Sequence, residues 1–267
     1  MFQPPSDNDR LLFAFTDIVD KAMQADNSSQ PKRQYLGASM IGEPCSRRLA
    51  YGYHGTPKDP DTGFKGKTLR MFDMGHDGET RMAQYLKLAG FNLQTHKEDG
   101  KQIGVSDCDG KFKGHLDGVF HAGPALPGLT YPALWENKAL GDGTFKKFKK
   151  DGLKGFNVKY WAQVQIYMGY YELPSCLFTA LNRDTGEMHV ELVQFDAVEC
   201  QALVRKATRI VESIDPEEFS PSGKNENQYE QNGISCKFCD WRSRCWSLAP
   251  VVIPKPSDEE PAWRRRS

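Results

Sequence analysis

Apolar residues recur at helical spacing in four stretches of the chain, which are separated by polar or Gly- and Pro-rich segments. The spacing predicts helices over residues 9–24, 68–89, 158–171 and 197–213. The second helix is expected to end at Gly90, because glycine readily adopts the left-handed conformation that terminates many helices. The polar segment 27–34 contains Pro31 and favours a loop after the first helix.

Between the second and third predicted helices the chain changes to short segments that are typical of strands. Strands are predicted within 112–120, 132–140, 175–181 and 188–195. A Gly- and Pro-rich loop over 122–132 separates the first two of them. The order of helices, strands and again helices indicates an α/β or α+β fold that contains a mixed sheet.

Composition narrows the class of protein. The chain has 267 residues, which fits one large domain or two small ones. Its mean hydropathy is -0.62, and no apolar stretch approaches the ~18 residues that span a bilayer, which excludes an integral membrane protein. No basic segment followed by an apolar one is found near the first residue, so no secretory signal is expected. Lys and Arg number 35, as do Asp and Glu, so any attraction for nucleic acid must be local.

Two segments carry candidate catalytic side chains, residues 114–119 with Asp117 and residues 134–138 with Glu136 and Lys138. Glu136 and Lys138 share one face of a strand, and Asp117 can lie beside Glu136 if the two segments pair. Two converging carboxylates repel each other unless a cation lies between them, and such oxygen ligands suit Mg²⁺ or Mn²⁺. In the alternative interpretation, Asp117 caps a turn and the other two form a solvated pair. Apolar neighbours such as Trp135, which place Glu136 in a half-buried strand, favour the metal site.

An Asp at the end of one strand, followed by (D/E)-x-K on the next, resembles the PD-(D/E)xK nuclease superfamily, although Leu116 stands where that motif has Pro. The predicted helix 158–171 contains Gln163 and Tyr167, similar to the Gln-x-x-x-Tyr motif of the RecB-like branch. Four residues apart, these two side chains share one helix face, which we expect to point toward the sheet.

The segment 75–79 resembles the first motif of the same branch, in which a Gly precedes by four residues a helical metal ligand. By that spacing Glu79 is the ligand, and His76 is a weaker candidate one turn away. The resemblance implies a restriction-endonuclease-like fold, that is, an α/β fold with a central mixed sheet flanked by helices. It also implies a Mg²⁺- or Mn²⁺-dependent DNA exonuclease.

The resemblance further implies a role for each site residue. Glu79, Asp117 and Glu136 would bind the metal, and Lys138 would assist the nucleophile. Gln163 and Tyr167 would position the scissile phosphate or the lysine.

Seven cysteines, an odd number without a secretory signal, favour a reducing compartment in which clustered thiolates bind metal. Cys236-x2-Cys239-x5-Cys245 is a strong local metal signal, because three thiolates can surround one centre within a short segment. Cys45 is the best candidate for a fourth ligand, and Cys108 is the alternative. Four cysteines could hold zinc or an iron–sulfur cluster, but zinc ligands usually come as two close pairs.

One early and three late cysteines around a nuclease core resemble the iron–sulfur RecB-like nucleases, which include CRISPR-associated single-strand exonucleases, AddB-type subunits and phage exonucleases. The resemblance implies a 4Fe-4S cluster that joins an N-terminal helical segment to the C-terminal part of the chain. The expected division is 1–67 for that helical segment, 68–215 for the nuclease core, 216–249 for the cysteine segment and 250–267 for a disordered tail.

Candidate DNA contacts are basic residues near the expected metal site, namely Lys146, Lys147, Lys149, Lys150, Arg47 and Arg48. The phenylalanines between the lysines, Phe145 and Phe148, are expected in the core instead. The expected partners are DNA, as single strands or ends, together with helicase, recombinase or replication proteins. The expected location is the cytoplasm of a bacterium or of a phage-infected cell.

Two alternatives stay open at this point. Residues 160–168 also resemble the Gln-x-Gln helix of lambda-type (YqaJ-like) exonucleases, which degrade duplex ends but do not generally carry the cysteines. A non-catalytic iron–sulfur DNA-binding subunit would keep the fold and cut nothing. The presence of both carboxylates and the lysine argues against this second alternative.

Overall fold

The computed structural model describes residues 6–219 and 234–247. The elements in chain order are α1 (Asp7–Ser29), β1 (Leu36–Gly37), the 3-10 turn η1 (Ala38–Met40), α2 (Ser46–Tyr53), α3 (Gly66–Leu88), β2 (Asn92–Gln94), β3 (Gly104–Asp107), β4 (Phe112–His115), β5 (Gly118–Ala122), β6 (Ala133–Leu140), α4 (Asp142–Phe156), α5 (Val158–Tyr171), β7 (Ser175–Asn182), β8 (Met188–Gln194), α6 (Ala197–Glu212), the 3-10 turn η2 (Pro216–Glu218), α7 (Ile234–Lys237) and α8 (Arg242–Ser247).

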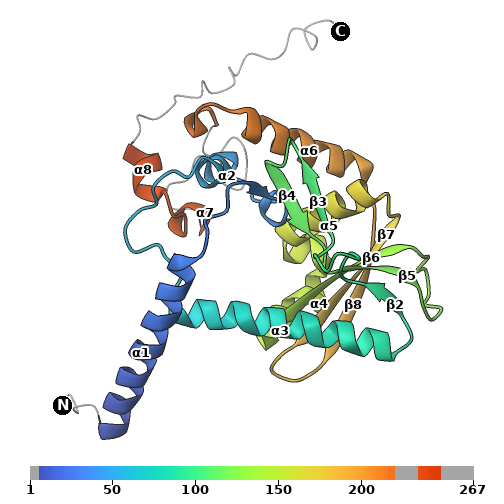
Figure 1. Ribbon diagram of the computed structural model, residues 1–267, viewed down its shortest axis with the longest axis horizontal. Helices are drawn as coiled ribbons and strands as arrows, with labels where there is room; N and C mark the ends of the chain where they lie inside the picture. Colours follow the sequence, from blue (N-terminus) through green and yellow to red (C-terminus); the bar gives the residue numbers. More distant parts are fainter. Residues whose placement is uncertain (1–5, 220–233, 248–267) are drawn as a thin grey trace, which may run out of the picture.

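The strands form two mixed sheets with helices packed around them (Figure 1). The larger sheet has the order β2-β5-β6-β7-β8, in which only β6 and β7 run parallel, and the smaller has the order β1-β4-β3. This confirms the predicted mixed α/β architecture. The predicted strand within 112–120 divides into β4 and β5, which belong to different sheets, so a second, smaller sheet accompanies the larger mixed one. Asp117 lies where the chain leaves one sheet for the other.

The four helices predicted from apolar spacing are present as α1, α3, α5 and α6. Gly90 has a φ of 88° just after α3, so the expected left-handed stop is confirmed. Pattern analysis did not predict α2, α4 or the strands β1 to β3. The sequence pattern of α4 did not identify a helix, because lysines and phenylalanines are interleaved in it and because Gly152 interrupts the helical backbone with a φ of 64°.

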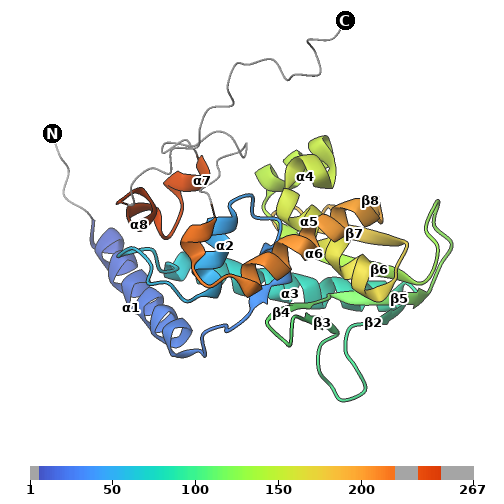
Figure 2. The same cartoon turned by 90° about the horizontal axis from the view of Figure 1, so that it is seen from above.

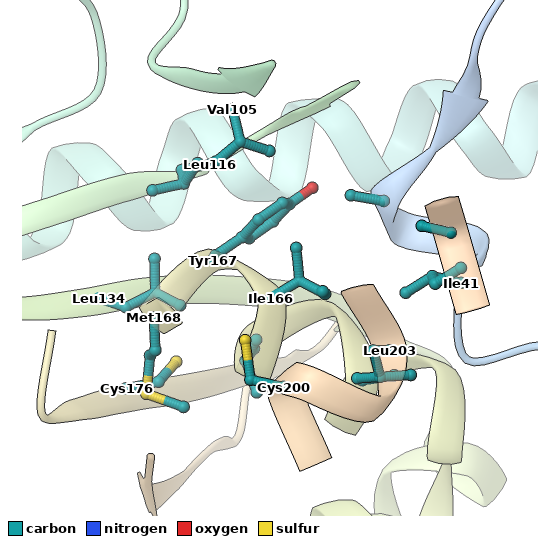
Figure 3. Packing of buried hydrophobic residues seen from close by; sticks show 14 of the residues in the cluster. Ile41, Val105, Leu116, Leu134, Ile166, Tyr167, Met168, Cys176, Cys200 and Leu203 are labelled. Carbon is teal, nitrogen blue, oxygen red and sulfur yellow. The ribbon is translucent and has the colours of Figure 1, made fainter. Parts of the chain in front are cut away.

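The core forms where strands β6 and β7 meet α5, and it continues to α6 on the other side of α5. Figure 3 shows this layer, in which Leu134 and Cys176 from the sheet meet Ile166 and Met168 of α5 and Leu203 of α6. All residues of α5 from 162 to 168 are buried, including its glutamines. A helix that is enclosed on all sides can place polar groups only where a partner is present.

Helix α1 buries none of its residues and projects from the rest of the fold (Figures 1 and 2). Its apolar side chains Leu11, Phe15 and Ile18 are each about two-thirds exposed, at 68%, 64% and 68%. The helix is attached to α3 through an ion pair between Asp20 and Arg70. No helix within 6–219 or 234–247 is both long enough and apolar enough to cross a membrane.

Helices α7 and α8 lie beside α2 in both views, although they are almost 200 residues apart in the sequence (Figures 1 and 2). The rings of Tyr51 and Trp241 pack with centroids 5.8 Å apart. The indole Nε1–H of Trp241 donates to the carbonyl of Thr56 at 2.9 Å. An early and a late segment therefore share a small apolar cluster. The expected tail, 250–267, lies outside the described residues.

Candidate active site

The pairing of β5 with β6 brings the two predicted carboxylates together. In this antiparallel pair Gly118 lies opposite Trp135, so Asp117 reaches the start of the Glu136–Lys138 segment. The amide N–H of Asn137 donates to Asp117 Oδ2 at 2.8 Å. Both carboxylates are buried, with Glu136 at 0% and Asp117 at 7% exposure. The hairpin therefore holds two carboxyl groups in the interior, where the predicted pairing of the two segments would put them.

Lys138 lies on the same face of β6 as Glu136, because side chains two residues apart share one face of a strand. Its Nζ donates to Glu136 Oε1, and it also lies 5.2 Å from the ring centre of Tyr160 on α5. The Lys138 side chain remains 20% exposed. The Glu136 end of the ion pair is thus fully buried, and the lysine side chain is mostly buried.

Helix α5 presents Gln163 and Tyr167 to this strand. Gln163 Nε2 donates to Glu136 Oε1 at 2.8 Å and lies 3.5 Å from the Tyr167 hydroxyl oxygen. Both side chains are almost fully buried. The helix begins at a fixed point because Asn157 Oδ1 accepts the amide of Lys159 at 3.0 Å. The two residues of the Gln-x-x-x-Tyr segment therefore face the carboxylates.

Glu79 reaches the same region from α3, which packs across β6. The close approach is possible because residue 78 is glycine. A Cβ added there would lie 2.6 Å from the Cβ of Ala139, whereas a Cβ at Gly75 would meet nothing within 4 Å. His76 is exposed and acts on Asp117 only through its charge. The packing role in this segment belongs to Gly78, although the motif spacing emphasised Gly75.

Electrostatic effects connect these groups. Burial raises the pKa of Glu136 to about 8, with a further contribution from Asp117. Burial also raises the pKa of Glu79 to about 7, again with a contribution from Asp117. The pKa of Asp117 is raised mainly by burial, against the opposing charge of Lys138. Burial lowers the pKa of Lys138, but Glu136 and Asp117 outweigh that effect and keep the lysine charged. Three carboxyl groups thus compete around one cation.

The donor set suits a hard divalent cation. Glu136 Oε2 is buried and has no hydrogen-bonding partner among the described residues, which is costly for a carboxylate. Glu79 and Asp117 supply further oxygen donors of the kind that Mg²⁺ and Mn²⁺ prefer. Within residues 6–219 and 234–247, however, no three His, Cys, Asp or Glu side chains are arranged closely enough to hold a metal ion as they stand. The agreement is therefore one of donor chemistry and charge.

The four candidate cluster ligands gather at the contact between α2 and the last two helices. The pKa values of the Cys236 and Cys239 thiols are raised mainly by burial and also by the charges of Cys45 and Cys245. Cys45 lies at the start of α2, where its Sγ accepts the amide of Arg48 at 3.4 Å. Cys108 lies elsewhere, 4.0 Å from the hydroxyl of Thr208. Cys45, and not Cys108, thus lies near the late cysteines, although these described thiols, like the carboxylates, are not close enough to one another to hold a metal as they stand.

The basic residues that were candidate DNA contacts differ in what surrounds them. Arg47 is 3% exposed, and its guanidinium donates to the carbonyls of Phe219 and Glu217 at 2.5 and 3.1 Å. It therefore joins segments of the fold, and the expectation that it faces DNA is corrected. Arg48 is paired with Glu43 at 3.4 Å.

On α4, Lys146 pairs with Asp142 and Lys149 with Glu187, at 2.7 and 2.6 Å. Lys147 and Lys150 are exposed and have no ion-pair partner among the described residues. Phe145 and Phe148, between the lysines, are fully buried, which confirms that they belong to the core.

Two glycines that allow close packing at the site were not predicted from the sequence. A Cβ at Gly114 of β4 would lie 2.6 Å from Cε1 of Tyr167 and 2.7 Å from the Cβ of Ala38. Gly78 likewise allows α3 and β6 to approach each other closely. The available signal was an isolated glycine inside a strand or helix pattern, which often marks a close approach of two backbones.

No protein-family model matches the sequence, and no curated protein sequence matches it. Among solved structures, the fold is similar to that of SSO0001, with a TM-score of 0.50 and 16% identity over 88% of this chain and 98% of that chain. An alkaline exonuclease from Laribacter hongkongensis (LHK-Exo) gives a TM-score of 0.47 and 13% identity over 72% of this chain and 90% of that chain. The same exonuclease in complex with dAMP gives a TM-score of 0.46 and 14% identity over 73% of this chain and 91% of that chain. At these identities the likeness to SSO0001 extends to the fold alone.

Proposed function

We propose that this protein is a Mg²⁺- or Mn²⁺-dependent deoxyribonuclease that acts as an exonuclease on single strands or DNA ends. One observation carries the proposal. Glu79, Asp117 and Glu136 come from three segments and lie near enough to Lys138 for their charges to interact, and the Glu136 Oε2 atom is buried without a partner among the described residues. Such a cluster of like charges is costly unless a ligand compensates for it.

The chain's own residues divide the work of phosphodiester hydrolysis. Glu79, Asp117 and Glu136 would hold the cation, which when bound would polarise the phosphate and acidify a water. Lys138 keeps its positive charge at neutral pH and is partly exposed, so it can offset charge that develops on the phosphate. Gln163 fixes the orientation of the Glu136 carboxylate through its 2.8 Å hydrogen bond. Tyr167 supports Gln163 from the next turn of α5.

DNA as the substrate is supported by the motif resemblance and by exposed positive charge. Lys147 and Lys150 have no acidic partner among the described residues, so they are available to phosphates. Lys146 and Lys149 already contact acidic side chains and would have to exchange them for DNA. The proposed contacts on α4 therefore centre on Lys147 and Lys150. Settings in repair, recombination or replication, with helicase, recombinase or replication proteins as partners, belong to the same proposal.

We further propose that Cys45, Cys236, Cys239 and Cys245 hold a 4Fe-4S cluster, with zinc as the weaker alternative. The support is the mutual effect of these thiols on their pKa values and their position between two distant segments. Positive groups lie beside the sulfurs, since Arg47 Nη1 is 3.7 Å from Cys245 Sγ. Such charges favour thiolates, which are the form that binds metal. The proposed role is structural and requires no redox step.

Removal of the divalent cation tests the proposed activity. The full chain is expected to shorten end-labelled single-stranded DNA in Mn²⁺ and to leave it intact in excess EDTA, because hydrolysis depends on the cation. Product ladders on single- and double-stranded substrates give the polarity and the strand preference. Faster digestion of duplex ends would support the lambda-type alternative. Retention of DNA without cleavage would contradict the proposal and favour the non-catalytic subunit.

A second test uses the two glycines of α3 as a matched pair. Gly78→Ala is expected to lower the cleavage rate at least tenfold, because the new Cβ would meet Ala139 and displace Glu79 from the carboxylate cluster. Gly75→Ala adds the same methyl group where nothing lies within 4 Å. It should keep full activity and gain up to about 1 kcal/mol of stability, because alanine is the better helix former. Equal rates for the two variants would mean that the position of Glu79 does not matter for cleavage.

A further inference from the structure

A cavity of about 360 Å³ opens between the β1 segment, α2 and the segment that carries Trp241. Its lining combines aromatic rings with cations, among them Arg33, Tyr35, Tyr53 and Trp241. A volume of this size is typical of sites for small organic ligands, which are usually about 300 Å³ or more. The cavity is therefore large enough for one nucleobase with its sugar.

Unpaired positive charge is concentrated at Tyr35. The Arg33 guanidinium lies 5.0 Å from the centre of its ring and Lys113 Nζ lies 5.6 Å from it. Neither cation has an acidic partner among the described residues. Arg33 lines the cavity, whereas Lys113 only reaches the Tyr35 ring. The remaining lining cations are paired, since Lys58 contacts Asp240 at 2.6 Å and Arg48 contacts Glu43. At this end of the cavity the ring of Tyr35 is thus in contact with two cations, and a base that stacks on the ring would take the place of one of them.

The cavity adjoins the candidate active site through two contacts. Gly37, in its wall, is followed by Ala38, which packs against Gly114 together with Tyr167. Glu43, also in its wall, pairs with Lys159 of α5 at 2.6 Å. Lys159 is four residues before Gln163, about 6 Å along the helix axis. The wall of the cavity is therefore in contact with β4 and α5, the elements that carry Gly114 and Gln163.

We propose that this cavity binds one unpaired nucleotide of a DNA strand whose phosphodiester lies at the carboxylate cluster. This proposal deepens the proposed nuclease function and rests on it. Aromatic faces stack on any unpaired base, and cations neutralise the flanking phosphates. A base inside a duplex is paired and is stacked on both faces, so it cannot enter without being extruded. The cavity would then produce a preference for single strands.

The test is equilibrium binding of a fluorescent oligo(dT) of six nucleotides to the full chain. No divalent cation is added, so that the oligonucleotide is not cleaved. Tyr35→Ala is expected to weaken binding about tenfold, since stacking contributes about 1–3 kcal/mol per base. Tyr35→Phe should stay within twofold of wild type, because it keeps the ring. Tyr85→Ala serves as the control. It removes an exposed ring near the C-terminal end of α3 that does not line the cavity, and the affinity is expected to stay unchanged.

Arg33→Ala gives an independent measurement, because Arg33 is exposed and its loss should not disturb the fold. It is expected to lower affinity and to reduce the slope of log K against log salt by about 0.7, the change for one phosphate contact on a single strand. A purely structural role for Arg33 would leave the slope unchanged. Wild-type affinity and slope in both Tyr35→Ala and Arg33→Ala would overturn the site.

Two further outcomes separate this proposal from the proposed function. Binding to a blunt duplex should be the same for wild type and Tyr35→Ala, and an equal loss on duplex would overturn the claim that the nucleotide is unpaired. If wild type binds the oligonucleotide through Tyr35 but does not cut it in Mn²⁺, the binding site stands and the nuclease function fails. If wild type cuts DNA but neither Tyr35→Ala nor Arg33→Ala changes binding, the nuclease function stands and the proposed binding site fails.

Discussion

Lys138→Ala is expected to lower the rate of DNA cleavage by about 10³-fold while the protein stays folded, because the variant loses the cation nearest to the proposed metal ligands. Removal of one preorganised electrostatic contact to a transition state typically costs about 10²–10³-fold. Lys138 is the ion-pair partner of the buried Glu136, whose pKa is raised to about 8, so that carboxyl can take up a proton when the cation is lost. The measurement is single-turnover digestion of end-labelled DNA in Mn²⁺.

Metal binding separates the role of Lys138 from that of the carboxylates. Mn²⁺ is expected to raise the melting temperature of wild type and of Lys138→Ala, because both keep the oxygen ligands. Addition of Mn²⁺ should leave the melting temperature of Asp117→Asn nearly unchanged, because that variant lacks a proposed ligand. Lys147→Ala is a matched control for the loss of one exposed lysine and should keep cleavage within about tenfold of wild type. Cleavage by Lys138→Ala at the wild-type rate would mean that the active site lies elsewhere.

Cys239→Ser is expected to yield colourless protein that binds little iron and melts well below wild type. The physical reason is that thiolate-bound metal contributes folding free energy directly, about 10–16 kcal/mol for structural zinc in small domains. Here the four thiols lie where α2 meets α7 and α8, so loss of a ligand should release that contact. Absorbance near 400 nm, iron and zinc analysis and thermal unfolding measure the effect.

The matched control for this variant is Cys108→Ser. Cys108 lies at a turn between β3 and β4, next to Thr208, and is not among the cysteines whose charges act on Cys236 and Cys239. We expect this variant to keep the wild-type colour, iron content and melting temperature within a few degrees. Iron retained in Cys239→Ser would overturn the ligand assignment. Stoichiometric zinc in the wild-type protein would replace the iron–sulfur cluster by the zinc alternative.

The order of strongly patterned elements could be predicted from the sequence. Helix α5 occupies the predicted range, and β6, β7 and β8 lie within one or two residues of their predicted ranges. Local spacing was sufficient there, because residues two apart on a strand or four apart on a helix share a face whatever surrounds them. The same spacing put Glu136 beside Lys138 and Gln163 beside Tyr167.

Other features could not be predicted, since they depend on which segments meet. Arg47 follows Cys45 in a basic, polar stretch that suggested a DNA contact, yet it is buried because two carbonyls of the η2 segment converge on it. The apolar stripe of α1 predicted an amphipathic helix, but in the described structure nothing covers Leu11, Phe15 and Ile18. Neither outcome is encoded in the residues within one turn of these positions.

The sequence by itself determined which side chains could do the chemistry, because residue type and spacing decide which groups share a strand or helix face. Only the tertiary structure decided that Glu79 reaches the same place, since this requires α3 to cross β6 at Gly78 with no Cβ between them. It also put Cys45 near enough to the late cysteines for their charges to interact, and it brought two cations to the ring of Tyr35, which lines a cavity. These are contacts between distant segments, and they form only when the whole core packs.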